Sequence, residues 1–224
     1  MVKSIAVVSL GQGTGKTTLA LNLGLALHKL NHRVLVFDTD FTKKNMLEHL
    51  DLHNIPINLS QVFQDDAHIK DVIYKHVSGI RLIPSNVHSS SMIEQDYNKL
   101  GYHYQDLLGD YDYIILDTPS QAPYLETVLK NADEALIIHT PSYSSKNVMD
   151  AMNLLNRLKV LNLGIVLNNF SEDGADEIFD HPILEKIPTH NDITKSYKHK
   201  NPLLHTYPKS KIAPKFHRLA KRFE

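Results

Sequence analysis

A glycine-rich segment near the start of the chain, VVSLGQGTGKTTLALNLG at residues 7–24, constrains the fold more than any other feature. A short apolar run precedes the glycines and leucines at helical spacing follow them, which predicts a strand, a tight turn and a helix in direct succession. Glycine permits the backbone conformations that let several N–H groups of such a turn converge on one point. The positive end of the following helix faces the same point. We therefore expect a phosphate-binding site at this turn.

The side chains of the turn favour a nucleoside triphosphate with a magnesium ion. Lys16 supplies a mobile positive charge for the β- and γ-phosphates, and the hydroxyl of Thr17 is the expected Mg²⁺ ligand. The expected phosphate-binding residues are Gly11, Gln12, Gly13, Thr14, Gly15, Lys16, Thr17 and Thr18. The strict phosphate-loop pattern, G-x-x-x-x-G-K-[ST], is not met, because Leu10 stands where the pattern requires glycine. The alternative interpretation is a glycine-rich turn that serves packing alone.

Apolar runs and helical patterns alternate along the rest of the chain. We expect strands at residues 4–10, 33–38, 79–84, 111–117, 134–140, 163–169 and 183–188. We expect helices at residues 17–30, 69–75, 105–108, 122–129, 144–158 and 212–223, and a polar surface loop at 84–100. Nearly continuous Val, Ile and Leu runs indicate strands covered on both faces. This predicts an α/β fold of three layers, a mostly parallel twisted sheet with helices on both faces, forming one domain over residues 1–224.

Composition excludes several classes of protein. The chain has no cysteine, so a disulfide, a thiolate metal site and an iron–sulfur carrier are excluded. No apolar run approaches the eighteen or so residues of a membrane span, and we expect a cytoplasmic protein. The net charge is −1, yet residues 185–224 contain ten Lys or Arg and three Asp or Glu. This basic segment is interpreted as a solvated helix face or as a surface for nucleic acid.

Polar residues follow several of the expected strands, where an open parallel sheet binds its ligands. Asp117 ends an apolar strand in the manner of a Walker B acid, which predicts a role in holding the metal. Asp38 and Asp40 end another strand and are expected to orient the metal or the attacking water. The alternative interpretation is that Asp40 caps the N-terminus of the next helix. Asn168 and Asn169 are candidates for pairing with the base, or for forming a turn.

Taken together, these motifs resemble the MinD/ParA family of P-loop ATPases over essentially the whole chain. The matching segments are GTGKTTLALNLGLAL, VLVFDTDF, YIILDTP, HTPSYSS, GIVLNN, KIPTHNDI and PLLHTYPKSKIAPKFHRLAKRF. The resemblance implies a MinD-like P-loop NTPase fold with ATP or ADP and Mg²⁺ as cofactors. It implies that Lys16 and Asp40 act in catalysis, that Thr17, Asp38 and Asp117 serve the metal, and that Asn168 and the loop at Pro188 enclose the adenine. It also implies a nucleotide-dependent homodimer.

The chain departs from the family pattern at Gly11, where relatives have a signature lysine that reaches across the dimer. A cation that reaches the phosphates from the partner subunit accelerates hydrolysis by a factor of about 10³–10⁵, so its absence predicts slow hydrolysis. Nucleotide binding is expected to persist, because Lys16, Thr17 and the backbone N–H groups remain. Lys43 and Lys44 are candidates to replace that charge, or are ordinary surface lysines. Restoring a lysine, Gly11→Lys, is expected to show whether its loss limits turnover. The chain also has an apolar helical face near its end, interpreted as core packing rather than as a membrane-targeting helix.

The leading functional expectation is an ATP-dependent dimerisation switch with weak ATPase activity, acting in spatial positioning such as cell division. A second is a nucleotide-bound scaffold or adaptor that does not hydrolyse ATP. A third is a DNA-partition ATPase similar to ParA, suggested by the basic segment. The expected partners are a second copy of the chain, another protein, and a membrane or DNA surface, with a position peripheral to the membrane or nucleoid as one outcome. A Ras-like GTPase is disfavoured because the chain lacks an N-K-x-D motif.

Overall fold

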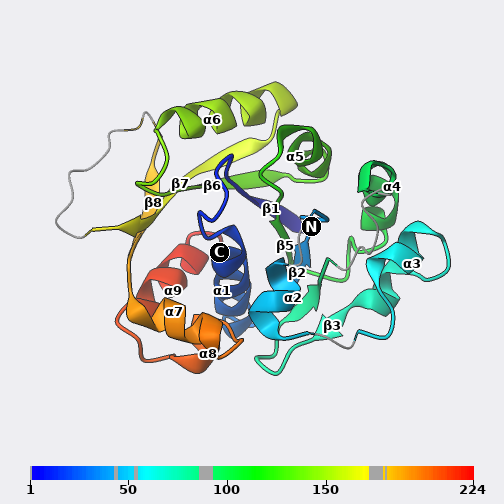
Figure 1. Ribbon diagram of the computed structural model, residues 1–224, viewed down its shortest axis with the longest axis horizontal. Coiled ribbons are helices and arrows are strands. Elements are labelled where there is room, and N and C mark those ends of the chain that lie inside the picture. Colours follow the sequence, from blue (N-terminus) through cyan, green and yellow to red (C-terminus); the bar gives the residue numbers. More distant parts are fainter. Residues whose placement is uncertain (1, 43–44, 53–54, 86–92, 172–178, 180) are drawn as a thin grey trace.

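The computed structural model describes residues 2–42, 45–52, 55–85, 93–171, 179 and 181–224. Its centre is an eight-stranded sheet with the order β3-β4-β2-β5-β1-β6-β7-β8 (Figure 1). All neighbouring pairs are parallel except β3 and β4, which are antiparallel at the edge of the sheet. The strands are β1 (Lys3–Val8), β2 (Val34–Asp38), β3 (Tyr74–Lys75), β4 (Arg81–Ile83), β5 (Tyr113–Asp117), β6 (Glu134–His139), β7 (Leu161–Phe170) and β8 (Ile183–Pro188). The expected mostly parallel α/β sheet is thereby confirmed, whereas the single domain over residues 1–224 stays a prediction.

Helices cover both faces of the sheet, as the unbroken apolar strands predict (Figure 1). The helices are α1 (Lys16–Lys29), α2 (Asn45–Leu50), α3 (Leu59–Phe63), η1 (Ile69–Val72), α4 (Ile93–Gln105), α5 (Ala122–Leu129), α6 (Lys146–Leu158), α7 (Asn191–Lys198), α8 (Leu203–Thr206) and α9 (Ala213–Lys221). Successive residues of β1 point to opposite faces: Ala6 and Val8 pack with α3 to α6, while Ile5 and Val7 pack with α1, α8 and α9. The sheet therefore separates two apolar cores.

The apolar face near the end of the chain belongs to one of these cores. Phe216, Leu219, Ala220 and Phe223 are all buried, and α9 packs against α1. The interpretation of this face as core packing is confirmed. Among the residues that the structure describes, no helix combines the length and the apolar character needed to cross a bilayer.

Three local predictions were wrong. The helix expected at 105–108 is absent, because α4 ends at Gln105 and the next three residues form a turn. The polar stretch at 84–100 was expected to be a loop, but α4 begins at Ile93 and extends to Gln105, while residues 86–92 lie outside the described part of the chain. The helix is supported by Tyr97, Leu100 and Tyr104, which are buried at helical spacing among polar neighbours. The helix expected at 69–75 is the short η1 followed by β3, because the chain pairs there with β4.

Candidate functional site

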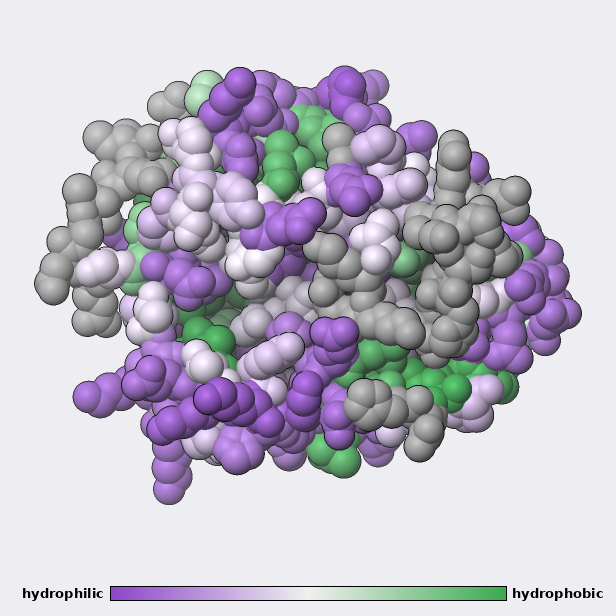
Figure 2. All heavy atoms as spheres, viewed as in Figure 1, coloured by the Kyte–Doolittle hydropathy of each residue, from purple (hydrophilic) through white to green (hydrophobic). Residues whose placement is uncertain are grey.

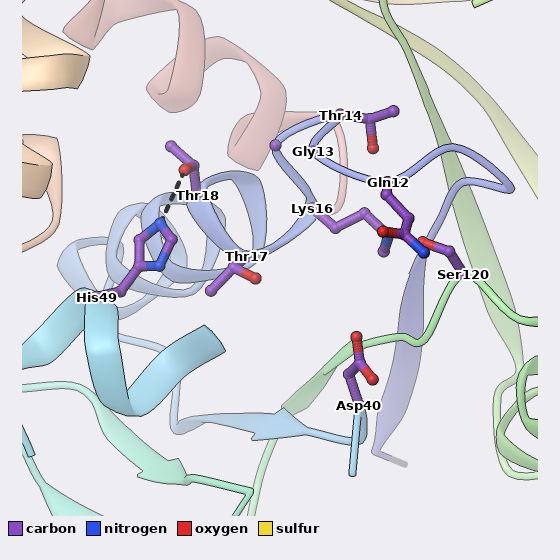
Figure 3. Close-up of a pocket in the computed structure, with 10 residues that line it drawn as sticks. Gln12, Gly13, Thr14, Lys16, Thr17, Thr18, Asp40, His49 and Ser120 are labelled. Carbon is purple, nitrogen blue, oxygen red and sulfur yellow. Dashed lines mark hydrogen bonds between the residues drawn. The ribbon is translucent and has the colours of Figure 1, made fainter. Parts of the chain in front are cut away.

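The carboxyl ends of β1, β2 and β5 open onto a cavity of about 240 Å³ (Figure 3). The glycine loop after β1 forms one wall, and the segments after β2 and β5 form the other. The described residues that line it are Gln12, Gly13, Thr14, Gly15, Lys16, Thr17, Thr18, Asp40, His49 and Ser120. Seven consecutive residues of the expected phosphate-binding loop are therefore brought together around one space.

The backbone of the loop has the form that its glycines predict. Gly13 has a φ of 67° and Gly15 a φ of 95°, both in the left-handed region that favours glycine. At Gly15 a Cβ atom would lie 2.5 Å from Nδ2 of Asn168, so a side chain has no room there. Helix α1 begins directly after this residue, at Lys16. The loop thus ends at a helix N-terminus that points toward the cavity, which favours an anion.

The ammonium group of Lys16 lies inside the site. The residue is 8% exposed, and Nζ donates hydrogen bonds to Oγ of Ser120 at 2.6 Å and to the carbonyl of Gly11 at 3.4 Å. The hydroxyl of Ser120 in turn donates to the same carbonyl at 3.1 Å. Figure 3 shows Lys16 and Gln12 pointing toward Ser120 on one side of the cavity. Ser120 was not among the predicted site residues, although it follows the strand-ending Asp117 by three positions.

Thr17 and Asp117 form the next part of the site. Oγ1 of Thr17 donates a hydrogen bond of 2.6 Å to Oδ2 of Asp117, and both residues are buried. Burial raises the pKa of the Asp117 carboxyl to about 6, although the Thr17 hydrogen bond and the charge of Lys16 oppose this shift. A carboxylate held against a hydroxyl at the loop is suited to a hard cation such as Mg²⁺. Their assignment to the metal stays a prediction.

Asp38 and Asp40 differ in their surroundings despite their similar positions in the sequence. Asp38 is fully buried and accepts hydrogen bonds from Oγ of Ser85 at 2.8 Å and from the backbone N–H groups of Asp40 and Met46 at 3.1 and 3.3 Å. Burial, followed by the charge of Asp117, raises the pKa of Asp38 well above its usual range. Asp38 does not belong to the described cavity lining, and its protein donors indicate that it shapes the segment after β2.

Asp40 does line the cavity, opposite Lys16 (Figure 3). Its carboxylate accepts hydrogen bonds from the backbone N–H and from the hydroxyl of Thr42, which is the pattern of a turn. Helix α2 begins only at Asn45, so the alternative interpretation of Asp40 as its N-cap is wrong. The neighbouring Lys43 and Lys44, considered as replacements for the signature lysine, lie outside the described residues.

Asn168 supports the loop from behind. Its Nδ2 donates a hydrogen bond of 2.8 Å to the carbonyl of Thr14, and the side chain is buried. Asn169 lies within β7 rather than in a turn, and its φ of 59° coincides with an irregularity in the pairing of β7 with β8 between Asn168 and Phe170. The described lining of the cavity includes neither Asn168 nor Pro188, which ends β8. Contacts of these two residues with a base stay predictions.

Gly11 also stands apart from the described cavity lining. Its N–H donates to Oγ of Ser9 at 3.2 Å, and a Cβ atom at this position would lie 2.7–2.8 Å from three ring carbons of Tyr143. A side chain at position 11 therefore requires the ring to move. The Gly11→Lys variant is for this reason not a clean test of the missing lysine, because it introduces a charge and a steric conflict together.

One further residue of the site comes from a helix beyond the segment after β2. His49 on α2 lines the cavity, with its Nε2 3.4 Å from Oγ1 of Thr18 (Figure 3). Its ring packs edge-on against Tyr197 of α7, with the ring centroids 4.6 Å apart.

Across the part of the chain that the structure describes, no three His, Asp or Glu side chains lie close enough to hold a metal ion by themselves. A divalent ion here would depend on the Thr17 hydroxyl, phosphate oxygens and water.

Known proteins resemble the chain in both sequence and fold. A family model described as an AAA domain matches residues 2–166. An ATP-binding protein of Methanocaldococcus jannaschii is 30% identical over 187 residues, covering 80% of this chain and 70% of that protein. The septum site-determining protein MinD of Bacillus subtilis is 26% identical over 252 residues, covering 99% of this chain and 89% of that protein. The structure of Pyrococcus horikoshii MinD complexed with Mg-ADP matches with a TM-score of 0.90 and 28% identity, covering 100% of this chain and 96% of that one.

Proposed function

The chain belongs to the MinD/ParA family of P-loop ATPases, and from this premise we propose that it is a MinD-like ATPase acting in cell division or a similar form of spatial organisation. The observation that supports this most directly is the convergence of Lys16, Thr17 and Asp117 at the mouth of the glycine loop. A cation, a hydroxyl and a carboxylate in this arrangement suit the phosphates and the metal of a Mg-nucleotide.

The cofactors are ATP or ADP together with Mg²⁺, as in the relative whose structure contains Mg-ADP. The residues of this chain fit them: Gly13 and Gly15 leave room for phosphate oxygens, and Lys16 provides the counter-charge. We assign the metal to Thr17, with Asp117 as the carboxylate that orients it. The bound nucleotide supplies a phosphoanhydride bond whose cleavage is the reaction of this family.

We assign hydrolysis to Asp40 and Lys16. Asp40 is 5% exposed at the cavity wall, where a carboxylate orients water, and Lys16 places its charge on the opposite side. Slow turnover is part of the proposal, because Gly11 provides no side chain that could reach a partner's phosphates. Weak hydrolysis suits a switch, since the bound state then persists.

The switch is proposed to operate through ATP-dependent dimerisation of two copies of the chain. The dimer would recruit another protein and a membrane or DNA surface, from a cytoplasmic pool. Size-exclusion chromatography of wild type and Asp40→Ala with no nucleotide, ADP or ATP tests this. We expect a dimer with ATP alone, and a longer-lived one for the variant. A single monomeric peak under all three conditions would contradict the dimer.

Calorimetry and single-turnover kinetics test the site itself. Wild type is expected to bind Mg-ATP, and Lys16→Ala to lose most of that affinity. Labelled ATP, mixed with excess protein, should be converted slowly to ADP and phosphate, and Asp40→Ala should abolish the conversion without preventing binding. No heat of association for the wild type with millimolar Mg-ATP would refute the nucleotide site.

A second candidate is a nucleotide-bound scaffold that does not hydrolyse ATP, and the packing of Tyr143 over Gly11 favours it. This contact fills the space that a side chain at position 11 would need, and position 11 is where the family resemblance implies a lysine. Single-turnover assays at protein concentrations where the dimer persists separate the two candidates, since a scaffold would bind ATP and leave it intact. The double variant Gly11→Lys, Tyr143→Ala adds the charge without the steric conflict, and at saturating Mg-ATP it should turn over faster than Tyr143→Ala alone if the lysine is what is missing.

The basic segment supports a ParA-like alternative less strongly. Lys215 and Arg218 both pair with Glu185, at 3.3 and 2.9 Å, and are therefore partly neutralised. Figure 2 shows a largely hydrophilic surface over the region of α7 and α8, as expected of a solvated face. Binding to non-specific DNA that falls steeply with salt concentration would favour this alternative. Negligible binding at low salt would exclude it.

A further inference from the structure

Tyr143 joins a distant part of the chain to the start of the phosphate loop. It lies in the connection between β6 and α6, where its N–H donates to the carbonyl of Thr140 at 3.1 Å and forms a turn. Its hydroxyl donates a hydrogen bond of 2.7 Å to the carbonyl of Gln12. The ring covers Gly11, as the short distances to a Cβ atom at that position show. Tyr143 thus contacts two consecutive residues of the loop.

This hydrogen bond has a consequence for the direction of the next N–H group. In a trans peptide the carbonyl oxygen and the amide hydrogen point to opposite sides. When the Gln12 carbonyl is held by Tyr143, the Gly13 N–H is turned away from Tyr143. Gln12 and Gly13 both line the cavity, and Figure 3 shows them on the loop that encloses it. The orientation of this peptide therefore decides whether the Gly13 N–H is available to a phosphate oxygen.

We propose that Tyr143 is a positioning residue that holds the Gln12–Gly13 peptide of the phosphate loop in its anion-binding orientation, and that Gly11 is required because the Tyr143 ring occupies the space of a side chain. The inference rests on the proposed nucleotide site and adds a residue to it. The ligand it concerns is the polyphosphate chain rather than the base, because the contact is confined to the loop. Tyr143 is half-buried, and we place it on the side of the loop that faces away from the ligand. The contact of Tyr143 with Gly11 and Gln12 is called the clasp below.

Because Gly11 and Tyr143 are in contact, a double variant tests the inference: removing the Tyr143 ring should cancel the effect of a side chain at position 11. The backbone of Gly11 does not have a left-handed φ, so alanine suits it apart from the contact with the ring. Gly11→Ala should therefore displace Tyr143 and weaken binding. In the Tyr143→Ala background the same methyl group meets no ring, and it should have no further effect. A purely structural role of either residue alone would instead give additive losses.

Calorimetry with Mg-ATP and with Mg-tripolyphosphate provides the affinity measurement. Tyr143→Phe should weaken both ligands by about three- to tenfold, as expected for the loss of one hydrogen bond. Gly11→Ala should weaken them by about tenfold or more, and Gly11→Ala, Tyr143→Ala should bind as Tyr143→Ala does. The matched control is Tyr102→Phe, at a side chain that is 74% exposed, which should leave both affinities unchanged. Equal affinity of wild type and Tyr143→Phe, or additive losses in the double variant, would overturn the inference.

A measurement without nucleotide separates this inference from the proposed function. In ¹⁵N–¹H spectra of the nucleotide-free protein, the Gly13 amide should shift or broaden in Tyr143→Phe and remain in place in Tyr102→Phe. If wild type fails to bind Mg-ATP but the Gly13 amide responds in this way, the proposed nucleotide site is refuted while the proposed role of Tyr143 in orienting the Gln12–Gly13 peptide is supported. An unchanged Gly13 amide in Tyr143→Phe refutes the clasp, whatever the affinity of the wild type.

Discussion

The hydroxyl of Thr17 donates a hydrogen bond of 2.6 Å to the carboxylate of Asp117, and this contact joins the first turn of α1 to the end of β5. The two residues are one hundred positions apart in the chain and both are buried. A hydroxyl held by a carboxylate has a defined orientation, which is what a ligand of Mg²⁺ requires. The contact thus prepares the metal position through a partner in a different strand.

Thr17→Val should remove the contribution of magnesium to nucleotide affinity. Valine has nearly the shape of threonine but no ligand oxygen, so the gain in ADP affinity on adding Mg²⁺ should fall by about tenfold or more. Thr17→Ser should retain most of it. Calorimetry with ADP, with and without Mg²⁺, measures this gain. If the valine variant kept the full magnesium effect, Thr17 would not be the ligand.

Asn168→Ala should weaken tripolyphosphate and ATP alike. The Nδ2 group of Asn168 is engaged with the Thr14 carbonyl, so its loss loosens the loop rather than a base contact. We expect a decrease of about three- to tenfold for both ligands with Mg²⁺, and a similar decrease for Asn168→Asp, which has the same shape but no donor. A loss confined to ATP, together with a weaker preference for ATP over GTP, would instead support the base contact that the sequence predicts.

The stability of the nucleotide-free protein should report the raised pKa of Asp117. Its pKa is about 6 in the folded protein against 3.8 as the ordinary value, so the folded chain holds more protons than the unfolded chain between these values. The free energy of unfolding therefore loses about 2–3 kcal/mol from this group as pH rises through that window. Asp117→Asn has no carboxyl group to titrate at this position. The free energy of unfolding of the variant, relative to that of wild type, should therefore rise by this amount between about pH 4 and pH 7.

Urea denaturation across this pH range measures the difference. Asp66→Asn, at an exposed position, is the control and should follow the wild-type curve. Parallel curves for wild type and Asp117→Asn would show that the carboxyl titrates at its ordinary pKa.

Tyr97→Phe should destabilise the protein and disturb Asp40. The buried hydroxyl of Tyr97 donates to the carbonyl of Thr39 at 2.8 Å and accepts from the N–H of Phe41 at 3.1 Å, so it holds both sides of Asp40. Its removal leaves buried backbone groups unpaired, which costs about 1–3 kcal/mol. We expect lower stability in denaturation experiments and slower single-turnover hydrolysis, with Mg-ATP affinity little changed.

The control for this prediction is again the exposed Tyr102→Phe. It should alter neither stability nor hydrolysis. A Tyr97→Phe protein that is less stable but hydrolyses ATP at the wild-type rate would show that the hydroxyl supports the fold and not the position of Asp40.

Much of the fold could be predicted because its signals are local. The glycine loop, the start of α1 and the strand ending at Asp117 depend on residues within a few positions of one another, and the structure matches the expected ranges to within a few residues. Helix α4 was missed because its buried face is formed by Tyr97, Leu100 and Tyr104 among polar neighbours, a pattern without the long aliphatic runs of the other elements.

The sequence by itself determined the class of the sheet, the phosphate loop and the family, since spacing along the chain decides which residues share a strand, a turn or a helix face. Only the tertiary structure decided which distant residues complete the site. Asp38 and Asp117 both end apolar strands, yet one is enclosed by protein donors and the other lies against Thr17. Ser120 and Tyr143 reach the loop from segments more than one hundred residues away. The physical reason is that the order of strands in the sheet, and not their order in the chain, sets which strand ends are neighbours.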